Sequence, residues 1–166
     1  MKVLITGGCG FIGSNFVRYL LNYGYRINVL DKLTYAGRKE NLRGILKEIK
    51  FLQADITNPR DVEKAIKGCK IVINFAAESH VDRSIKKPAP FLKTNILGTW
   101  ILLEKALKHK IDLFIQVSSD EVYGSISKGF FKENSPLNPS SPYSASKASG
   151  DNLCQSYYRT FGLPII

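Results

Sequence analysis

Three glycines near the start of the chain constrain its fold more than any other feature. Residues 3–5 are aliphatic and predict a short buried strand, which leads through Gly7, Gly10 and Gly13 into a helical pattern. Glycines at this spacing let the backbone turn tightly and approach a pyrophosphate, while the N–H groups of the following helix point at the phosphates. The segment therefore predicts a loop that binds the pyrophosphate of a dinucleotide.

Short aliphatic runs recur along the rest of the chain, with helical patterns between them. These runs cover residues 3–5, 27–30, 51–52, 71–75 and 113–117. Residues 71–75 lack the alternation of apolar and polar side chains that is typical of a half-exposed strand, which indicates a parallel sheet covered on both faces. We therefore predict an α/β fold, a Rossmann-type doubly wound parallel sheet, and assign residues 1–166 to one dinucleotide-binding domain.

Helix signals agree with this order of elements. Asn58 is a favourable N-cap and Gly68 a favourable stop signal for one helix. The spacing of apolar residues predicts a longer helix near residues 91–108, and a third helical pattern begins at Tyr143. Residues 124–142 are rich in glycine, serine and proline, which predicts an irregular loop inside the domain and makes that loop a candidate to line a site.

The charge and cysteine content limit the partners and the compartment. The chain has 24 Lys and Arg against 14 Asp and Glu, a net charge of +10 that favours anionic partners. No basic run exceeds Lys86-Lys87, which argues against nucleic acid and leaves phosphorylated small molecules. Three cysteines without a C-x-x-C pair suggest neither a disulfide framework nor a metal site. No apolar run is long enough for a membrane span, so we expect a cytoplasmic protein.

An acidic residue predicts which dinucleotide binds. Asp31 directly follows the second predicted strand, 18 residues after Gly13. A carboxylate there accepts hydrogen bonds from ribose hydroxyls and repels a 2′-phosphate, which favours NAD over NADP, although the neighbouring Lys32 weakens this argument slightly. Two weaker signals concern the same cofactor. Residues 55–56 are candidates to contact its adenine, and residues 75–77 offer small side chains, Ala76 and Ala77, beside it.

A tyrosine and a lysine form the second chemical signal. Tyr143 and Lys147 are four residues apart, so they lie on one face of the predicted helix. A phenol titrates near pH ~10 and needs a nearby cation to act as a base at neutral pH. With Ser118-Ser119 at the end of the fifth predicted strand, this pair indicates a tyrosine base, supported by a lysine, beside the dinucleotide.

Four further segments resemble those of a known family. Residues 31–37, 76–84, 94–99 and 118–124 carry this resemblance, together with the glycine loop and the Tyr-Lys pair. They resemble the dTDP-glucose 4,6-dehydratases, which are extended short-chain dehydrogenases/reductases, and the adjacent acids Asp120 and Glu121 are the most specific part. The resemblance implies an NAD-dependent lyase that acts on dTDP-glucose by oxidation at C4, elimination of water across C5 and C6, and return of the hydride to C6.

The resemblance also implies a role for each catalytic candidate. Tyr143 takes the proton of the C4 hydroxyl, and Lys147 bonds the nicotinamide ribose and supports the tyrosine. Glu121 removes the C5 proton, and Asp120 protonates the departing C6 hydroxyl. These roles require that oxidation at C4 comes first, because the C5 proton is not acidic until C4 is a ketone.

Binding residues follow from the same resemblance. Ser79 and Ser119 are implied to contact the substrate, with serine at 119 where the family usually has threonine. The implied contacts to NAD come from strand ends and helix starts, and no metal is implied. They are Gly7, Gly10, Phe11, Ile12, Gly13, Asp31, Lys32, Leu33, Thr34, Asp55, Ile56, Phe75, Ala76, Ala77, Thr94, Tyr143 and Lys147.

The length of the chain leaves alternatives open. Residues 163–166 read as the start of another strand, whereas family members extend well beyond this length, so we expect a chain truncated before the C-terminal substrate-binding region. The resemblance also implies a homodimer formed through the helix near residues 91–108 and the helix that begins at Tyr143. The alternatives are a nucleotide-sugar 4-epimerase, which shares Tyr143 and Lys147 but not the acid pair, another nucleotide-sugar dehydratase, and an NAD-binding module without turnover.

Overall fold

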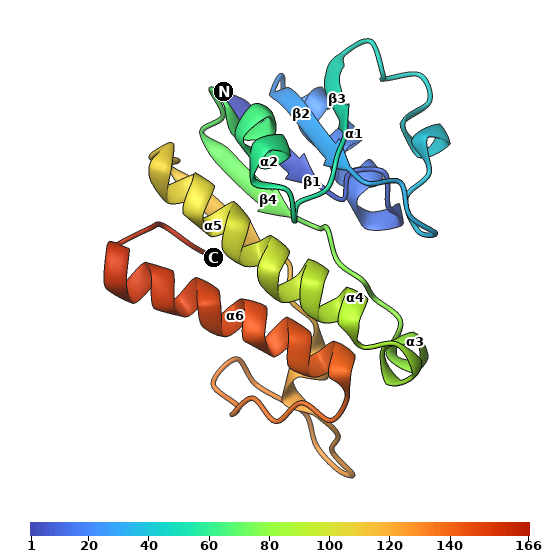
Figure 1. Cartoon of the computed structure of the whole chain (residues 1–166), viewed down its shortest axis with the longest axis vertical. Helices are drawn as coiled ribbons and strands as arrows, with labels where there is room; N and C mark the ends of the chain where they lie inside the picture. The colour runs from blue at the N-terminus through green and yellow to red at the C-terminus, as the bar shows by residue number, and fades with distance from the viewer.

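Five strands form one parallel sheet in the computed structural model, which describes residues 1–166. The strands are β1 (Lys2–Thr6), β2 (Arg26–Asp31), β3 (Ile49–Gln53), β4 (Ile71–Asn74) and β5 (Leu113–Gln116). Their order is β3-β2-β1-β4-β5, and every neighbouring pair is parallel. The chain therefore winds to one side of β1 and then to the other, which confirms the predicted doubly wound sheet (Figure 1).

Helices cover the sheet on two faces, because successive strand residues point to opposite sides. They are α1 (Phe11–Asn22), α2 (Pro59–Ile66), α3 (Val81–Lys86), α4 (Ala89–Phe91), α5 (Thr99–Lys108) and α6 (Pro142–Phe161), with the short turns η1 (Lys39–Leu42) and η3 (Asp120–Tyr123) and the π-helical segment η2 (Leu92–Gly98). Val3 and Ile5 share one core cluster with Val17 of α1. Leu4 and Phe114 share the other with side chains of α2, α5 and α6. Figure 1 shows α5 and α6 running side by side.

The third strand is longer than predicted. It spans Ile49–Gln53 rather than residues 51–52 alone and lies at the edge of the sheet. Lys50 and Gln53 are exposed there, so polar residues interrupt the aliphatic run that marks the buried strands. Beyond α6, Ile165 forms a parallel bridge with Phe114, at the position of the further strand predicted near the end of the chain.

The helix predicted near residues 91–108 is one helical run from α4 through η2 to α5, with a π-helical middle. A π-helix carries more residues per turn than an α-helix, so the buried side of this run shifts along its length. Phe91 is buried before the π-helical segment, Asn95 within it, and Leu102 and Leu103 after it. Leu92, the first residue of η2, is exposed.

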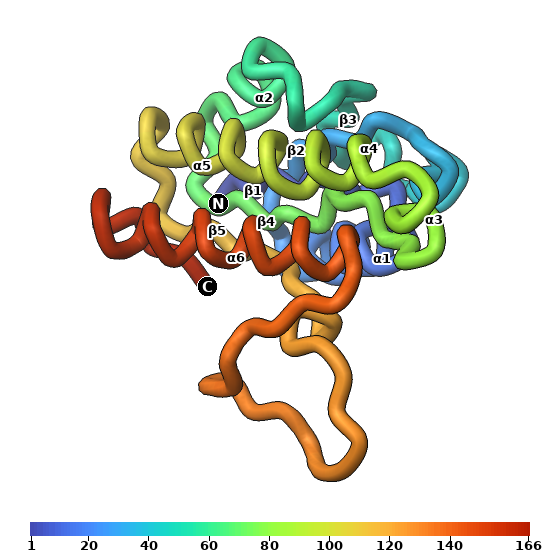
Figure 2. The backbone as a smooth tube through the Cα atoms, turned by 60° about the horizontal axis from the view of Figure 1, so that its bottom comes forward, coloured from blue at the N-terminus to red at the C-terminus, as the bar shows by residue number.

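The segment between η3 and α6 has no helix or strand, as predicted for residues 124–142. Gly124 starts it with a φ of 85°, and Asn138 donates a main-chain hydrogen bond to Val122 where the segment returns. Figure 2 shows the loop extending away from the body of the molecule. None of residues 124–142 lines the cavity described below, so the expectation that this loop lines a site stays a prediction.

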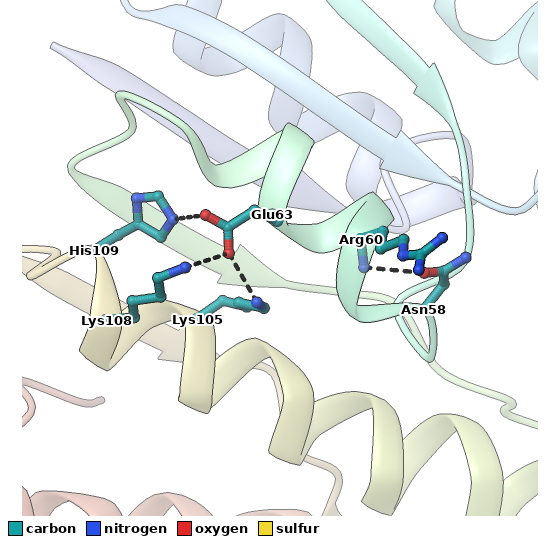
Figure 3. Close-up of polar contacts among 6 residues, drawn as sticks. All are labelled: Asn58, Arg60, Glu63, Lys105, Lys108 and His109. Carbon is teal, nitrogen blue, oxygen red and sulfur yellow. Dashed lines mark hydrogen bonds and ion pairs between the residues drawn. The ribbon is translucent and has the colours of Figure 1, made fainter.

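A charged cluster ties α2 to α5 (Figure 3). Asn58 caps α2 with its side chain, as predicted. One turn into the helix, Glu63 lies within 2.8 Å of Lys105, 3.2 Å of Lys108 and 2.8 Å of His109. Hydrogen bonds from Lys105, His109 and Lys108 lower the pKa of Glu63 to about 2.

Two further features bear on the class of protein. Cys9, Cys69 and Cys154 are free and buried. Burial is the largest cause that raises the pKa of each of these thiols, to about 12, 11 and 12 respectively. None of the helices has the length and apolar content that crossing a membrane requires.

Candidate active site

A cavity of about 390 Å³ lies where the glycine loop meets the carboxyl ends of the strands. This is the place where the strand order reverses between β1 and β4, and doubly wound sheets bind ligands at such a place. The cavity wall includes all but one of the residues predicted to contact a dinucleotide. Residues far apart in the sequence, from Gly7 to Lys147, are thus brought to one site.

The glycine loop requires its glycines at two positions. Gly7 has a φ of 66°, and a Cβ there would lie 2.6 Å from the main-chain nitrogen of Ala76. A Cβ on Gly13 would overlap the carbonyl oxygen of Gly7. A Cβ on Gly10, by contrast, would have its nearest neighbour, the Gly7 carbonyl oxygen, at 3.3 Å. The loop is therefore packed closely on the end of β4 and on its own first turn.

The start of α1 offers main-chain donors to the cavity. The N-cap residue is Gly10, so no side chain caps the helix, and its first turn contains no acidic residue. The first turn of an α-helix has N–H groups without partners inside the helix and a partial positive charge. Phe11, Ile12 and Gly13 of this turn line the cavity. This end of the cavity is therefore suited to an anionic group such as a pyrophosphate.

Asp31 is buried at the end of β2, and both of its carboxylate oxygens are held by the main chain. Oδ2 accepts a hydrogen bond from the N–H of Cys9 at 2.8 Å, and Oδ1 accepts one from the N–H of Leu33 at 2.8 Å. A Cβ on Gly37 would lie 2.6 Å from Oδ1, so the loop after β2 passes close to the carboxylate. Gly37 lines the cavity and was not among the predicted contacts.

Leu33 is the one predicted cofactor contact that does not line the cavity. Its φ of 58° lies in the left-handed region, and its side chain packs against the core cluster around α1. The sequence places Leu33 between Lys32 and Thr34, which both line the cavity. Its contribution is instead the main-chain hydrogen bond to Asp31.

An ion pair closes another part of the wall. Nζ of Lys32 lies 2.6 Å from Oδ2 of Asp55. Burial raises the pKa of Asp55, but hydrogen bonds from Lys32 and Thr57 outweigh burial, so the net pKa is lowered. Asp55 is therefore charged at neutral pH. This arrangement partly neutralises Lys32, the residue that weakened the case for Asp31 as the determinant of cofactor preference.

Tyr143 enters the cavity from the first turn of α6. A reciprocal capping box between Ser141 and Ser144 starts this helix, and Pro142 occupies its first position. The N–H of Tyr143 donates to Oγ of Ser84 at 3.0 Å, and its ring meets Phe91 edge-on with 6.2 Å between centroids. The phenol is therefore carried on a well-anchored turn.

Lys147 lies one turn further along α6 and is 6% exposed. Its Nζ donates a hydrogen bond to the carbonyl oxygen of Val117, just after the end of β5. Burial lowers the pKa of Lys147, and the negative charge of Asp151 offsets part of this decrease. Tyr143 and Lys147 both line the cavity, so the geometry agrees with the predicted pair.

A buried asparagine that the sequence analysis did not single out holds the Tyr143 turn in place. Asn95 of η2 accepts a hydrogen bond from the N–H of Glu78 at 2.9 Å and donates to the Glu78 carbonyl at 3.0 Å. It also donates to Oγ of Ser146 at 2.9 Å, and Ser146 donates to the carbonyl of Tyr143 at 2.6 Å. The sequence offered two signals that Asn95 has a role. It is a polar residue within a mostly apolar helical pattern, and it lies in the segment 94–99 that carries the resemblance.

The two predicted acids lie outside this cavity. Asp120 and Glu121 belong to η3, with Asp120 exposed and Glu121 half-buried. Ser119 also lies outside, because its Oγ caps η3 by accepting from the N–H of Glu121 at 3.3 Å. Its neighbour Ser118 lines the cavity instead, and so does Ser79, the other residue predicted to contact the substrate. The structure therefore separates a cofactor-sized site from the two acids. The first of them, Asp120, follows Ser118 of the cavity wall by two residues in the sequence. No cluster of His, Cys, Asp and Glu is arranged to hold a metal ion.

Comparison with known proteins adds the family context. The family model described as GDP-mannose 4,6 dehydratase matches residues 4–166. The low-salt glycan biosynthesis protein Agl12 of Haloferax volcanii is 51% identical across 100% of this chain and 54% of its own length. A dTDP-glucose 4,6-dehydratase of Streptomyces niveus is 45% identical across 100% of this chain and 52% of its own length. The chain thus spans about half the length of the curated relatives it matches.

Solved structures share the fold over nearly the whole chain. The dTDP-glucose 4,6-dehydratase DesIV of Streptomyces venezuelae, solved with NAD bound, has a TM-score of 0.96 and 44% identity over 99% of this chain and 54% of that chain. A UDP-glucose 4-epimerase of Thermus thermophilus, also in complex with NAD, has a TM-score of 0.93 and 34% identity over 99% of this chain and 53% of that chain. Dehydratases and epimerases therefore share this architecture.

Proposed function

The chain belongs to the GDP-mannose 4,6-dehydratase family, and on that premise we propose that it is the NAD-binding half of a dTDP-glucose 4,6-dehydratase. The observation that carries the proposal is that one cavity holds Asp31, the glycine loop and the Tyr143–Lys147 pair. The proposed reaction converts dTDP-glucose to dTDP-4-keto-6-deoxyglucose, a precursor for dTDP-rhamnose synthesis. The enzyme is a hydro-lyase of the cytoplasm.

The cavity fits NAD by its donors and by its close-packed glycines. The open first turn of α1 would hold the pyrophosphate, and the Asp31 carboxylate would accept hydrogen bonds from the ribose hydroxyls. A 2′-phosphate would meet the Asp31 charge directly, which disfavours NADP. When bound, NAD supplies the acceptor for the hydride from C4 and the donor of that hydride to C6.

Tyr143 is the base that removes the proton of the C4 hydroxyl. Its phenolate takes the proton of the C4 hydroxyl as that carbon is oxidised, and the positive charge of Lys147, one turn along α6, favours the phenolate. Lys147 would also hold the nicotinamide ribose. The anchoring of the Tyr143 turn by Ser84 and Asn95 keeps the phenol in place for this step.

The elimination step falls to the two acids of η3. Once C4 is a ketone, Glu121 would remove the C5 proton and Asp120 would protonate the hydroxyl that leaves C6. When the hydride returns to C6, protonated Glu121 would return a proton to C5, which completes the 4-keto-6-deoxy sugar. Because these acids lie just outside the cavity, the hexose would extend from Tyr143 past Ser118 toward η3. Ser79 and Ser119 would hydrogen-bond the substrate along this path.

Assembly follows from an exposed apolar face. Leu92, Leu97 and Trp100 are 46%, 40% and 42% exposed on the η2–α5 run, and Tyr158 and Phe161 are exposed on α6. Packing of the η2–α5 run and α6 against the same helices of a second copy would cover these side chains and form a homodimer. Light scattering checks this: a dimer is expected, and a mass that stays monomeric at high concentration would contradict it.

A nucleotide-sugar 4-epimerase is the second candidate, because an epimerase of the same fold matches this chain at a TM-score of 0.93. It would use Tyr143 and Lys147 but would have no need of Asp120 and Glu121. The identity to dehydratases, 44% and 45% against 34% to the epimerase, favours dehydration. Product analysis of a full-length protein with dTDP-glucose decides: a 4-keto-6-deoxy sugar supports dehydration, and a galactose epimer refutes it.

A further inference from the structure

One half-buried acid next to the site has no role in the proposed reaction. Asp151 lies on α6 one helical turn beyond Lys147, on the side that packs against the end of β5. Its Oδ2 accepts a hydrogen bond from Oγ of Ser118, a residue that lines the cavity. Ser118 directly follows Val117, whose carbonyl accepts the hydrogen bond of Lys147. Val117 and Ser118, the two residues that follow β5, are thus bonded to two consecutive turns of α6.

Close packing keeps this arrangement rigid. Gly150, the neighbour of Asp151, lies where a Cβ would be 3.2 Å from the carbonyl oxygen of Asn95 and 3.6 Å from Nε2 of Gln116. Helix α6 therefore approaches both η2 and β5 closely at this point. Lys147 and Asp151 are not within ion-pair distance of each other, so the acid acts on the lysine through its charge and through the shared β5 end.

We propose that Asp151 is a positioning residue for Lys147: its carboxylate holds Ser118 and the end of β5 against α6, and its negative charge keeps the buried Lys147 ammonium charged beside Tyr143. The proposal rests on the proposed function for its catalytic meaning. Its structural content, the effect of Asp151 on Lys147, does not need turnover. The direction in which Asp151 acts on the pKa of Lys147, upward against burial, agrees with it. Burial also raises the pKa of Asp151, and the hydrogen bond from Ser118 and the charge of Lys147 offset part of that increase.

Other charges around this pair are few. Along α6, Cys154 is a buried thiol whose pKa is raised to about 12, mainly by burial. Glu104 of α5 bonds the hydroxyl of Tyr157. The remaining charged groups on α6 and on the elements packed against it are Arg159 of α6, Lys105 and Lys108 of α5, Asp82, Arg83 and Lys86 of α3, Lys93 of η2, and Asp120 and Glu121 of η3. None of them forms an ion pair with Lys147 or Asp151. Asp151 is therefore the carboxylate best placed to act on Lys147.

The direct test follows the titration of the Lys147 amine by NMR in the 166-residue chain, with its signal assigned by its loss in Lys147→Arg. Asp151→Asn keeps an oxygen acceptor for Ser118 but removes the charge, so the Lys147 midpoint should move to lower pH. Ser118→Ala keeps the charge of Asp151 and should move the Lys147 midpoint less. Asp112→Asn makes the same charge change at an exposed site on the other end of β5 and should leave it unchanged. An unchanged midpoint in Asp151→Asn would overturn the proposal.

Asp151→Glu gives a second, independent reading, because it keeps the charge. Its Lys147 midpoint should stay at the wild-type pH, and a fall equal to that of Asp151→Asn would also overturn the proposal. In a full-length enzyme, Asp151→Asn should lower turnover by roughly tenfold to a hundredfold, increasingly at alkaline pH. An equal loss at every pH would show a merely structural role. If the wild type itself makes no 4-keto-6-deoxy sugar, the proposed function fails while the NMR result stands.

Discussion

Asp31 and Cys9 are joined by a hydrogen bond of 2.8 Å, from the N–H of Cys9 in the glycine loop to Oδ2 of Asp31 at the end of β2. The other carboxylate oxygen accepts from the N–H of Leu33. The acid proposed to select NAD therefore also fixes the loop proposed to hold the pyrophosphate. Cofactor preference and loop geometry are linked through one side chain, and changes at Asp31 are expected to affect both.

The first prediction follows from this link. The chain should bind NAD more tightly than NADP by roughly tenfold or more, measured by calorimetry. Asp31→Ala should lose that preference and also lower the free energy of unfolding by about 2 kcal/mol, since the buried N–H of Cys9 and the partly buried N–H of Leu33 lose their acceptor. Asp112→Asn is the control for the charge change, because Asp112 is exposed. Equal affinity of the wild type for the two dinucleotides would refute the role of Asp31.

The second prediction separates two glycines of the same loop. Gly13→Ala should lower the free energy of unfolding by about 1–3 kcal/mol, because its Cβ would overlap the Gly7 carbonyl. Gly10→Ala is the matched control, since its Cβ would have no neighbour closer than 3.3 Å. Urea denaturation of both variants checks this. If Gly10→Ala were the more destabilised of the two, the account of the loop packing would be wrong.

The third prediction concerns the Glu63 cluster and its pH dependence. The pKa of Glu63 is lowered to about 2 in the folded chain, below the value of about 4.3 for an unperturbed glutamate. Its stabilising contribution should therefore be complete above that unfolded value and should disappear as the pH falls toward 2. Denaturation of the wild type and Glu63→Gln should show a difference at pH 7 that shrinks at acid pH. Glu48→Gln, at an exposed position outside the ion pairs, is the control, and a difference that persisted at low pH would contradict the assignment.

Much of the fold could be predicted because its signals are local. The aliphatic runs of β1, β2, β4 and β5 and the glycine turn after β1 each act within a few residues, and their alternation with helices implies a parallel sheet. The edge strand β3 could be predicted only in part, since Lys50 and Gln53 face solvent. The π-helical segment η2 has no such local signal.

The site could be predicted where residues adjacent in sequence share one role. Leu33 shows the limit of that reasoning, because a left-handed backbone turns its side chain to the core while both neighbours line the cavity. Asn95 and Asp151 act only through partners distant in sequence, Glu78 and Ser118, and such contacts exist only after folding. Likewise, the placement of Asp120 outside the cavity depends on how the chain turns into η3.

The fourth prediction assigns the order of the chemical steps in a full-length protein, since the 166-residue chain alone should have little or no turnover. Glu121→Gln should oxidise C4 and then stall, so that reduced nicotinamide accumulates and exchange of the C5 hydrogen with solvent deuterium is lost. Tyr143→Phe should fail earlier, binding NAD without reducing it. Each variant should lose turnover by ~10²- to 10⁴-fold. Rapid C5 exchange in Glu121→Gln would assign the base to another residue.

The most direct measurement of the central claim follows one hydrogen atom through the reaction. A full-length protein is given dTDP-glucose labelled with deuterium at C4, and the product is examined by NMR. Dehydration with NAD held in the cavity beside Tyr143 predicts a 4-keto-6-deoxy sugar that carries the deuterium at C6. A product that keeps the deuterium at C4, as an epimer would, contradicts the account.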